Sequence, residues 1–244
     1  MTRSSMLWVA RQAGWVTLGV LVYFSVRGLT EGSAEAARAN AHDLVALERA
    51  LGLHVEGALQ DLLAPSDSLR TVANWIYIWG HWPVIAATMV WLAVEHRHVF
   101  LRLRDGMLVS GAVGMVVFAL HPVAPPRLLD LGMVDTVTEE SRSYRVLQPP
   151  AFTNQYAAMP SLHSGWDLLV GIAIVTAASA LWLRVVGFAM PVLMGFAVVA
   201  TANHFVLDVV AGVALSLVGH AVALRLDRRR RRRAAVAHPP EVLA

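Results

Sequence analysis

Long apolar runs with almost no charge dominate this sequence and limit what it can fold into. The hydrocarbon core of a membrane is about 30 Å thick, and a helix of roughly 17–25 residues can cross it. Only 15% of the residues are charged and 57% are hydrophobic, whereas a soluble domain carries about 25% charged residues. The sequence therefore predicts an all-α fold, a polytopic membrane bundle with six transmembrane helices at residues 12–26, 71–94, 106–120, 161–183, 185–204 and 209–224.

We expect one membrane domain over residues 1–244. Its predicted parts are a first transmembrane helix (1–30), an extracytoplasmic amphipathic segment (31–68), a five-helix catalytic bundle (69–226) and a basic cytoplasmic tail (227–244). The fifth span is expected to kink at Pro191, and the end of the tail to be disordered.

The extracytoplasmic segment predicts one or two amphipathic helices that break near Gly52. They would lie either along the membrane interface or on the bundle as a packed cap. The pattern rests on apolar residues with charged residues between them, namely Leu44, Leu47, Leu51 and Val55 with Glu48, Arg49 and Glu56.

A cleaved secretory signal is an alternative for the first span. Arg3 and Arg11 flank the start of the apolar run, and Ala34-Glu35-Ala36 resembles a cleavage site. The charged stretch at 27–33 makes the gap before that site long, so we favour a retained helix.

Arginine distribution predicts the orientation. All 20 basic residues are arginine, and those that lie between or beside the spans fall mostly on one side. The positive-inside rule makes that side cytoplasmic. We therefore expect a protein of the cytoplasmic (inner) membrane with both termini in the cytoplasm and the active site at the outer face. The run Arg228–Arg233 is expected to bind anionic lipid rather than nucleic acid.

The stretch Pro160-Ser161-Leu162-His163 predicts a site for an anion. A proline suits the first turn of a helix, where backbone N–H groups have no partner within the helix. Such N–H groups, together with the positive end of the helix dipole, attract a phosphate. His163 would stand next to that phosphate.

His204 and Asp208 form the second part of the predicted site. They are four residues apart and so share one face of a helix. A carboxylate that fixes the tautomer of a histidine makes its other ring nitrogen a better base or nucleophile. An alternative is a buried structural pair.

Further polar residues are expected at the same membrane face. Arg127 follows three prolines, and its guanidinium suits a phosphoryl group, although an interfacial anchor is the alternative. Asn74, Tyr77 and His81 share a helix face, where they either contact a lipid head group or hydrogen-bond across helices.

These motifs together resemble the type 2 phosphatidate phosphatase superfamily. Pro160-Ser161-Leu162-His163 and His204-x-x-x-Asp208 are similar to its second and third signatures. Finer details resemble its inositolphosphotransferase branch, which contains fungal inositol-phosphorylceramide synthase. The details are Asn74-x-x-Tyr77-x-x-x-His81-x-Pro83, Pro122-x-Ala124-Pro125-Pro126-Arg127, Ala157-Ala158-Met159 before the second signature with Gly165-Trp166 after it, and Ala202-Asn203-His204.

The resemblance implies a role for each residue. His204 would be the nucleophile that takes the phosphoryl or phosphodiester group, with Asp208 orienting it. His163 would protonate the leaving group and then deprotonate the acceptor. Arg127 and the amides of Ser161 and Leu162 would bind the phosphate. Weaker substrate contacts are expected from Asn74, Tyr77, His81, Asn203 and Asp167, and neither a cofactor nor a metal is expected.

Two cations of the superfamily pattern are missing. Leu120 and Val198 stand where a lysine and an arginine are usual. Arg142 or Arg145 would have to supply any further charge. Less positive charge suits a phosphodiester better than a terminal phosphate, which favours a transferase over a monoester phosphatase.

The sequence thus predicts an integral-membrane lipid phosphotransferase. It would move a head group such as phosphoinositol from a lipid donor to a hydroxyl acceptor through a phosphohistidine. One alternative is a hydrolase of phosphatidate or polyprenyl (di)phosphate, with water as acceptor. Two others are a zinc hydrolase with His81, His163, His204 and Asp208 as ligands, and a non-enzymatic lipid transporter.

Overall fold

The computed structural model describes residues 3–29, 33–140 and 154–237. Apart from an isolated β-bridge between Val123 and Ala157, these ranges consist of helices and their connections. The helices are α1 (Arg3–Leu29), α2 (Ala34–Leu51), α3 (Glu56–Asp61), α4 (Asp67–Trp79), α5 (Trp82–Glu95), α6 (Arg97–Leu120), the 3-10 turn η1 (Pro126–Leu128), α7 (Thr136–Glu140), α9 (Leu162–Ala177), α10 (Leu181–Ala200) and α11 (Val206–Ala237).

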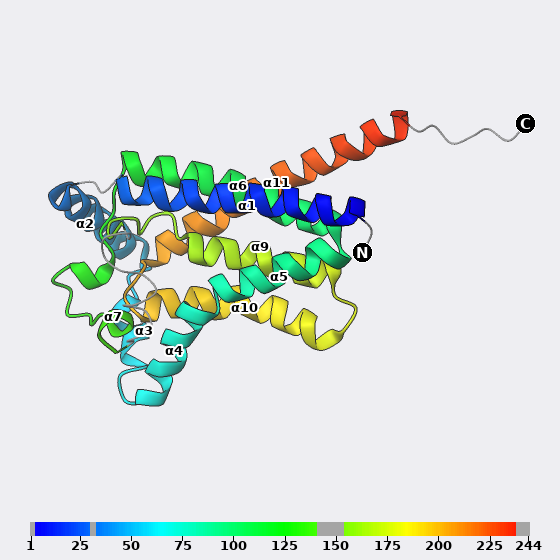
Figure 1. Ribbon diagram of the computed structural model, residues 1–244. Coiled ribbons are helices and arrows are strands. Elements are labelled where there is room, and N and C mark those ends of the chain that lie inside the picture. The colour runs from blue at the N-terminus through cyan, green and yellow to red at the C-terminus, as the bar shows by residue number, and fades with distance from the viewer. Residues whose placement is uncertain (1–2, 30–32, 141–153, 238–244) are drawn as a thin grey trace, which may run out of the picture.

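The long helices lie side by side in a bundle, and the short ones gather at one end of it (Figure 1). The short helices α2, α3 and α7 lie at the end where α6 and α10 finish and α9 and α11 begin. Helix α1 begins and helix α11 ends at the opposite end. The all-α fold is therefore confirmed. The end of α10 and the starts of α9 and α11, where His204, His163 and Asp208 lie, are at the same end of the bundle.

Helix α9 lies at the centre of the bundle, against α5, α6, α10 and α11. Its close approach to α11 depends on two glycines. A Cβ at Gly212 would overlap the carbonyl oxygen of Ser161, and a Cβ at Gly165 would overlap the Gly212 carbonyl. Trp166 ties the same helix to α6, because its indole N–H donates to Ser110 Oγ at 3.1 Å. The start of α9 is thus fixed against the start of α11.

Three described helices are long and apolar enough to cross a membrane, namely α6, α10 and most of α11. A fourth span results if the bent pair α4 and α5 is counted as one. The apolar helices at Leu7–Val22 and Leu162–Ala177 are shorter. A membrane protein is therefore supported, but the full set of six spans is not confirmed.

The second predicted span is not one straight helix. Helices α4 and α5 meet at an angle of 45°. Pro83 lies in the first turn of α5, and a proline there has no N–H for the preceding turn and would clash with its carbonyl group. The chain therefore breaks at Gly80 and His81, although hydropathy runs through the break without change.

The boundary between the fourth and fifth spans was predicted wrongly at Arg184. Ala178 and Ala180 have extended backbones and separate α9 from α10. Arg184 lies inside α10, with its N–H donating to Ala180 at 3.3 Å. Helix α10 then runs through Pro191 to Ala200.

Charged residues at the other end of the bundle are inside helices, not in loops. Helix α6 starts at Arg97, before the predicted start at residue 106. Helix α11 continues through the arginine run to Ala237. The tail after Arg233 was expected to be disordered, so the helix is longer than predicted. Arginine favours helix, and Asp227 binds both Arg102 of α6, at 2.7 Å, and Arg231, at 3.2 Å. The pair with Arg102 holds the extended helix to α6, and the pair with Arg231 lies within α11.

Residues 31–68, for which one or two amphipathic helices were predicted, contain the two helices α2 and α3. They separate at Gly52, whose φ of +69° is readily adopted only by glycine. The buried face of α2 differs from the predicted one, because Leu47 and Leu51 are about half exposed. Its buried residues are Ala37, Ala41, Leu44, Val45 and Glu48, and they pack against the bundle as a cap.

Candidate active site

The loop between α10 and α11 presents His204. The backbone N–H groups of Asn203 and His204 both donate to the carbonyl oxygen of Val198, at 3.0 Å each. Ala202 has a φ of +57°, a left-handed conformation that turns the chain directly after α10. The loop is therefore fixed by its own backbone, and His204 is only 5% exposed.

Asp208, in the first turn of α11, faces this histidine. Its Oδ2 accepts the N–H of Phe205 at 2.8 Å and lies 3.4 Å from Nδ1 of His204. That separation is longer than a hydrogen bond, but catalytic hydrogen bonds often shorten only when substrate binds. A carboxylate on the Nδ1 side favours the tautomer with the proton on Nδ1, which leaves Nε2 as the nucleophilic nitrogen.

Ser161 caps α9 and joins it to α11. Its hydroxyl accepts the N–H of Ser164 at 3.5 Å. Its own N–H donates to the Asp208 carbonyl oxygen at 2.9 Å, so the expected free amide at Ser161 is not present. Pro160 precedes the cap and is not in the first turn. The Leu162 amide takes no part in the backbone hydrogen bonds of the described chain, and it is the better candidate to bind an anion.

His163 lies next to His204 across the gap between α9 and the α10–α11 loop. The two ring centroids are 6.1 Å apart, with an angle of 53° between the planes. Tyr77 of α4 stacks on the other side of His163, at 4.7 Å and 18°. Two imidazoles at this distance can contact the same phosphorus-centred group from two sides.

His81 and Asp167 form a second histidine–aspartate pair next to His163. Nδ1 of His81 is 2.7 Å from Oδ1 of Asp167, and both side chains are almost fully buried. The His81 ring lies 4.3 Å from the ring of His163 and is stacked 6.1 Å from Trp166. Asp167 therefore binds His81, not His163, and the ring of His81 packs against the ring of His163.

Arg127 is fixed beside the His204 loop. Its Nη1 donates to Asn203 Oδ1 at 2.8 Å, and its Nε lies 3.0 Å from Asp135 Oδ2. The backbone N–H of Arg127 donates to the Ala202 carbonyl at 3.0 Å. Asp135 thus balances the charge of this arginine, which the sequence pattern did not reveal.

The Asn74 side chain forms hydrogen bonds between two helices. Its amide donates to the Thr136 carbonyl and accepts from the Thr136 hydroxyl, both at 3.0 Å. Both contacts are buried and join α4 to α7. Of the two alternatives for Asn74, hydrogen bonding between helices agrees with this geometry.

Two glutamates to which the sequence pattern assigned no role in the site cap α11. Glu48 Oε1 accepts the N–H of Leu207 at 2.8 Å, and Glu56 Oε1 accepts the N–H of Val206 at 3.1 Å. Both glutamates are fully buried. The spacing of Ala41 and Glu48, seven residues apart on one helix face, was a signal that the charge points inward.

The predicted zinc ligands do not come together as a metal site in the described residues. The group there that could hold a metal ion consists of Glu48, His54 and Glu56, not of His163 and His204. Arg142 and Arg145 lie outside the described residues.

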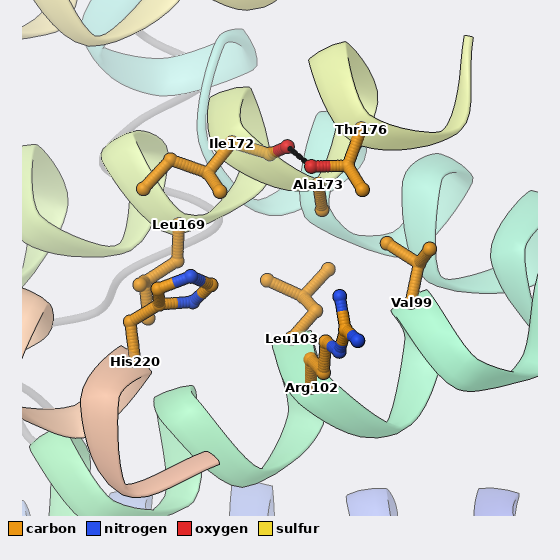
Figure 2. A pocket seen from close by; sticks show the side chains of 8 residues that line it. All are labelled: Val99, Arg102, Leu103, Leu169, Ile172, Ala173, Thr176 and His220. Carbon is orange, nitrogen blue, oxygen red and sulfur yellow. Dashed lines mark hydrogen bonds between the residues drawn. The ribbon is translucent and has the colours of Figure 1, made fainter. Parts of the chain in front are cut away.

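A cavity of about 40 Å³ lies between α6, α9 and α11 (Figure 2). Its polar lining includes Arg102, Thr176 and His220. Arg102 is near the start of α6 and Thr176 is near the end of α9, so the cavity is at the far end of the bundle from His163. It has room for about three water molecules and is separate from the candidate site.

Comparison with known proteins agrees with this geometry. The family model of the PAP2 superfamily matches residues 42–222. Among solved structures, the chain is similar to the crystal structure of Aquifex aeolicus LpxE, with a TM-score of 0.54 and 14% sequence identity, over 71% of this chain and 95% of that one. Identity this low shows a shared fold. No curated protein matches the chain. Since the family model covers well over half of the 244 residues, the chain belongs to the PAP2 superfamily.

Proposed function

We propose that this enzyme transfers a phospho-head group, such as phosphoinositol, from a membrane lipid to a hydroxyl acceptor through a phosphohistidine at His204. One observation carries the proposal. The rings of His163 and His204 lie 6.1 Å apart, and the Asp208 carboxylate stands on the Nδ1 side of His204 alone. This arrangement supports His204 as the nucleophile and His163 as the acid–base.

In the first step, Nε2 of His204 attacks the phosphorus of the donor lipid. The bond from phosphorus to the diacylglycerol oxygen breaks, and protonated His163 gives its proton to that oxygen. The Asp208 carboxylate stabilises the positive charge that develops on the His204 ring. The products of this step are diacylglycerol and a phosphoinositol group joined to Nε2 of His204 by a phosphorus–nitrogen bond.

In the second step, His163, now neutral, takes the proton of the acceptor hydroxyl. The acceptor oxygen attacks the phosphorus, the bond to Nε2 breaks, and His204 returns to its starting state. In-line placement and charge stabilisation supply most of the catalysis in phosphoryl transfer. Arg127 and the Leu162 amide are positioned to bind the non-bridging oxygens.

The charge of the site supports a diester substrate. Arg127 is paired with Asp135, so its charge is already partly balanced before substrate binds. A phosphodiester carries one negative charge and needs less compensation than a terminal phosphate with nearly two. The ring of Tyr77 stacks on His163, and an apolar ring at that place would disfavour water as the acceptor. Both features favour transfer over hydrolysis.

We further propose that six segments cross the cytoplasmic membrane, namely α1, the bent α4–α5 pair, α6, α9, α10 and α11. The arginine run of α11 would then lie at the inner surface, where its exposed side chains suit anionic lipid. The candidate site, at the opposite end of the bundle, would face outward.

Reconstitution with labelled lipid tests the transferase assignment. Purified protein in liposomes receives phosphatidylinositol labelled in the head group, with and without a hydroxyl lipid. We expect a new labelled lipid that forms only with the acceptor and disappears in His204→Ala. His121→Ala is the matched control, because His121 is an exposed histidine at the same end of the bundle.

Release of labelled inositol phosphate at the same rate with or without acceptor would show a hydrolase. Release of free phosphate from phosphatidate alone would identify the monoester phosphatase alternative. Either result would contradict the transferase proposal while keeping the two histidines in their roles.

A further inference from the structure

Three side chains that can bind a metal ion converge in the cap. Glu48 comes from α2, Glu56 opens α3, and His54 lies in the connection between them. One ligand atom from each lies within 4.8 Å of the other two. Nδ1 of His54 is 3.0 Å from Oε2 of Glu56 and 3.9 Å from Oε2 of Glu48.

These inward-pointing atoms lack hydrogen-bond partners in the described structure. Glu48 Oε2, Glu56 Oε2 and His54 Nδ1 are buried and unpaired, and both glutamate side chains are fully buried. The other oxygen of each glutamate is used by a backbone N–H at the start of α11. Each carboxylate is therefore held in place by one oxygen and presents the second to a common point.

The spacing matches metal coordination. Zinc binds imidazole nitrogen and carboxylate oxygen at about 2.0–2.2 Å, which places tetrahedral ligand atoms about 3.4 Å apart. The two separations measured from His54 Nδ1 lie on either side of that value. One imidazole with two carboxylates suits zinc and similar transition ions, whereas calcium and magnesium prefer oxygen ligands throughout.

The charges also favour a cation at this point. Two buried carboxylates side by side repel each other and are poorly solvated. A divalent ion would balance both charges at once.

We propose that Glu48, His54 and Glu56 bind one divalent transition ion of the zinc class, as a structural site that clamps the cap onto the catalytic loop. The clamp acts through the two glutamates, which hold the N–H groups of Val206 and Leu207. Those residues follow His204 by two and three positions. The ion does not contact substrate, so the site goes beyond the proposed function and does not depend on it.

Zinc binding by the full-length protein tests the site. Protein in detergent is treated with chelator, desalted and titrated with zinc chloride, and bound zinc and the thermal unfolding midpoint are measured. Cobalt(II) serves as a spectroscopic probe, because tetrahedral nitrogen–oxygen coordination gives visible absorption. We expect one zinc per chain and a higher unfolding midpoint with zinc than without.

Two variants and one control distinguish this site from adventitious binding. Glu48→Gln keeps an oxygen for the Leu207 N–H but loses the charge, and His54→Ala removes a partly exposed ligand. Losing a group in the outer shell of a metal site costs about 10–100-fold in affinity, so loss of a ligand should cost at least as much. His42→Ala, an exposed histidine on the same helix, should bind as the wild type does.

Three results would overturn the site. The first is that folded wild-type protein binds no zinc, and the second is that His54→Ala binds zinc as tightly as the wild type. The third is that zinc-free Glu48→Gln has a higher unfolding midpoint than the wild type while zinc has no effect on the wild type. The last would mean that the carboxylates share a proton instead of a metal ion. None of these readouts involves turnover, so they stand apart from any failure of the transferase assay.

Discussion

Asp208→Asn tests the role of the Asp208 charge while leaving the shape of the site almost unchanged. Asparagine has nearly the same shape and can still accept the N–H of Phe205, which the native carboxylate accepts at 2.8 Å. Only the negative charge near His204 is lost. The neighbouring Glu48 and Glu56 would also be relieved of a like charge, so the fold should not weaken.

The expected loss of rate follows from the 3.4 Å between Asp208 Oδ2 and His204 Nδ1. Unit charges at that distance interact by about 5 kcal/mol at an effective dielectric constant of about 20. The positive charge develops fully only when His204 carries the phosphoinositol group, so this figure is an upper limit on the stabilisation lost. Because each 1.36 kcal/mol is tenfold in rate, we expect kcat to fall by about 1000-fold.

Single-turnover transfer in liposomes measures this effect. Asp61→Asn is the control, since Asp61 is an exposed aspartate at the end of α3; it should transfer at the wild-type rate. The thermal unfolding midpoint of each variant shows that it is folded. Asp208→Asn that is folded and transfers within about tenfold of wild type would refute the assigned role of the carboxylate.

Three stability predictions follow from the packing, each measured as the unfolding midpoint in detergent. Asn74→Ala removes both buried hydrogen bonds between α4 and α7 and should cost about 1–3 kcal/mol; an unchanged midpoint would contradict the bracing role. Gly212→Ala places a methyl group against a carbonyl oxygen of α9 and should cost about 1–3 kcal/mol, whereas Gly195→Ala, whose nearest neighbour would be 3.7 Å away, should be neutral; equal midpoints would contradict the close helix contact. His81→Ala leaves Asp167 buried without its partner and should cost about 3–5 kcal/mol, more than Asp167→Asn does; the reverse order would show that the pair is not held as an ion pair.

Spacing along the chain predicted the central pair of histidines. Each stands at the end of an apolar segment, and a helical hairpin brings the start of one span near the end of the next. That reasoning placed His163 and His204 at the same end of the bundle, where their rings lie 6.1 Å apart. It needed no knowledge of side-chain packing.

Hydropathy could not locate the helix breaks. The chain stays apolar through Ala178–Ala180 and through Gly80, so a count of uncharged residues passes over both. Pro83 was a usable signal for the second break, since a proline marks the first turn of a new helix. Arg184 was misleading, because an arginine can lie within the first turn of a helix as easily as in a loop.

The sequence did not show which groups the buried charged residues bind. Arg127 and Asp135 are close in the chain, but Glu48 and Leu207 are 159 positions apart. A pattern of residue types shows that a charge exists, and it does not show which group binds it. The sequence therefore predicted candidate ligands of the phosphate. It did not predict that the Ser161 N–H binds the Asp208 carbonyl or that Asn74 binds Thr136.

Detection of the phosphohistidine is the most direct test of the central claim. Protein is incubated with head-group-labelled phosphatidylinositol in the absence of a hydroxyl lipid, quenched at alkaline pH, where phosphorus–nitrogen bonds to histidine survive, and digested for mass spectrometry. We predict a labelled adduct on the peptide that contains His204, absent in His204→Ala and discharged when acceptor is added. Transfer by His204→Ala at the wild-type rate, or an adduct on His163 in its place, would contradict the mechanism.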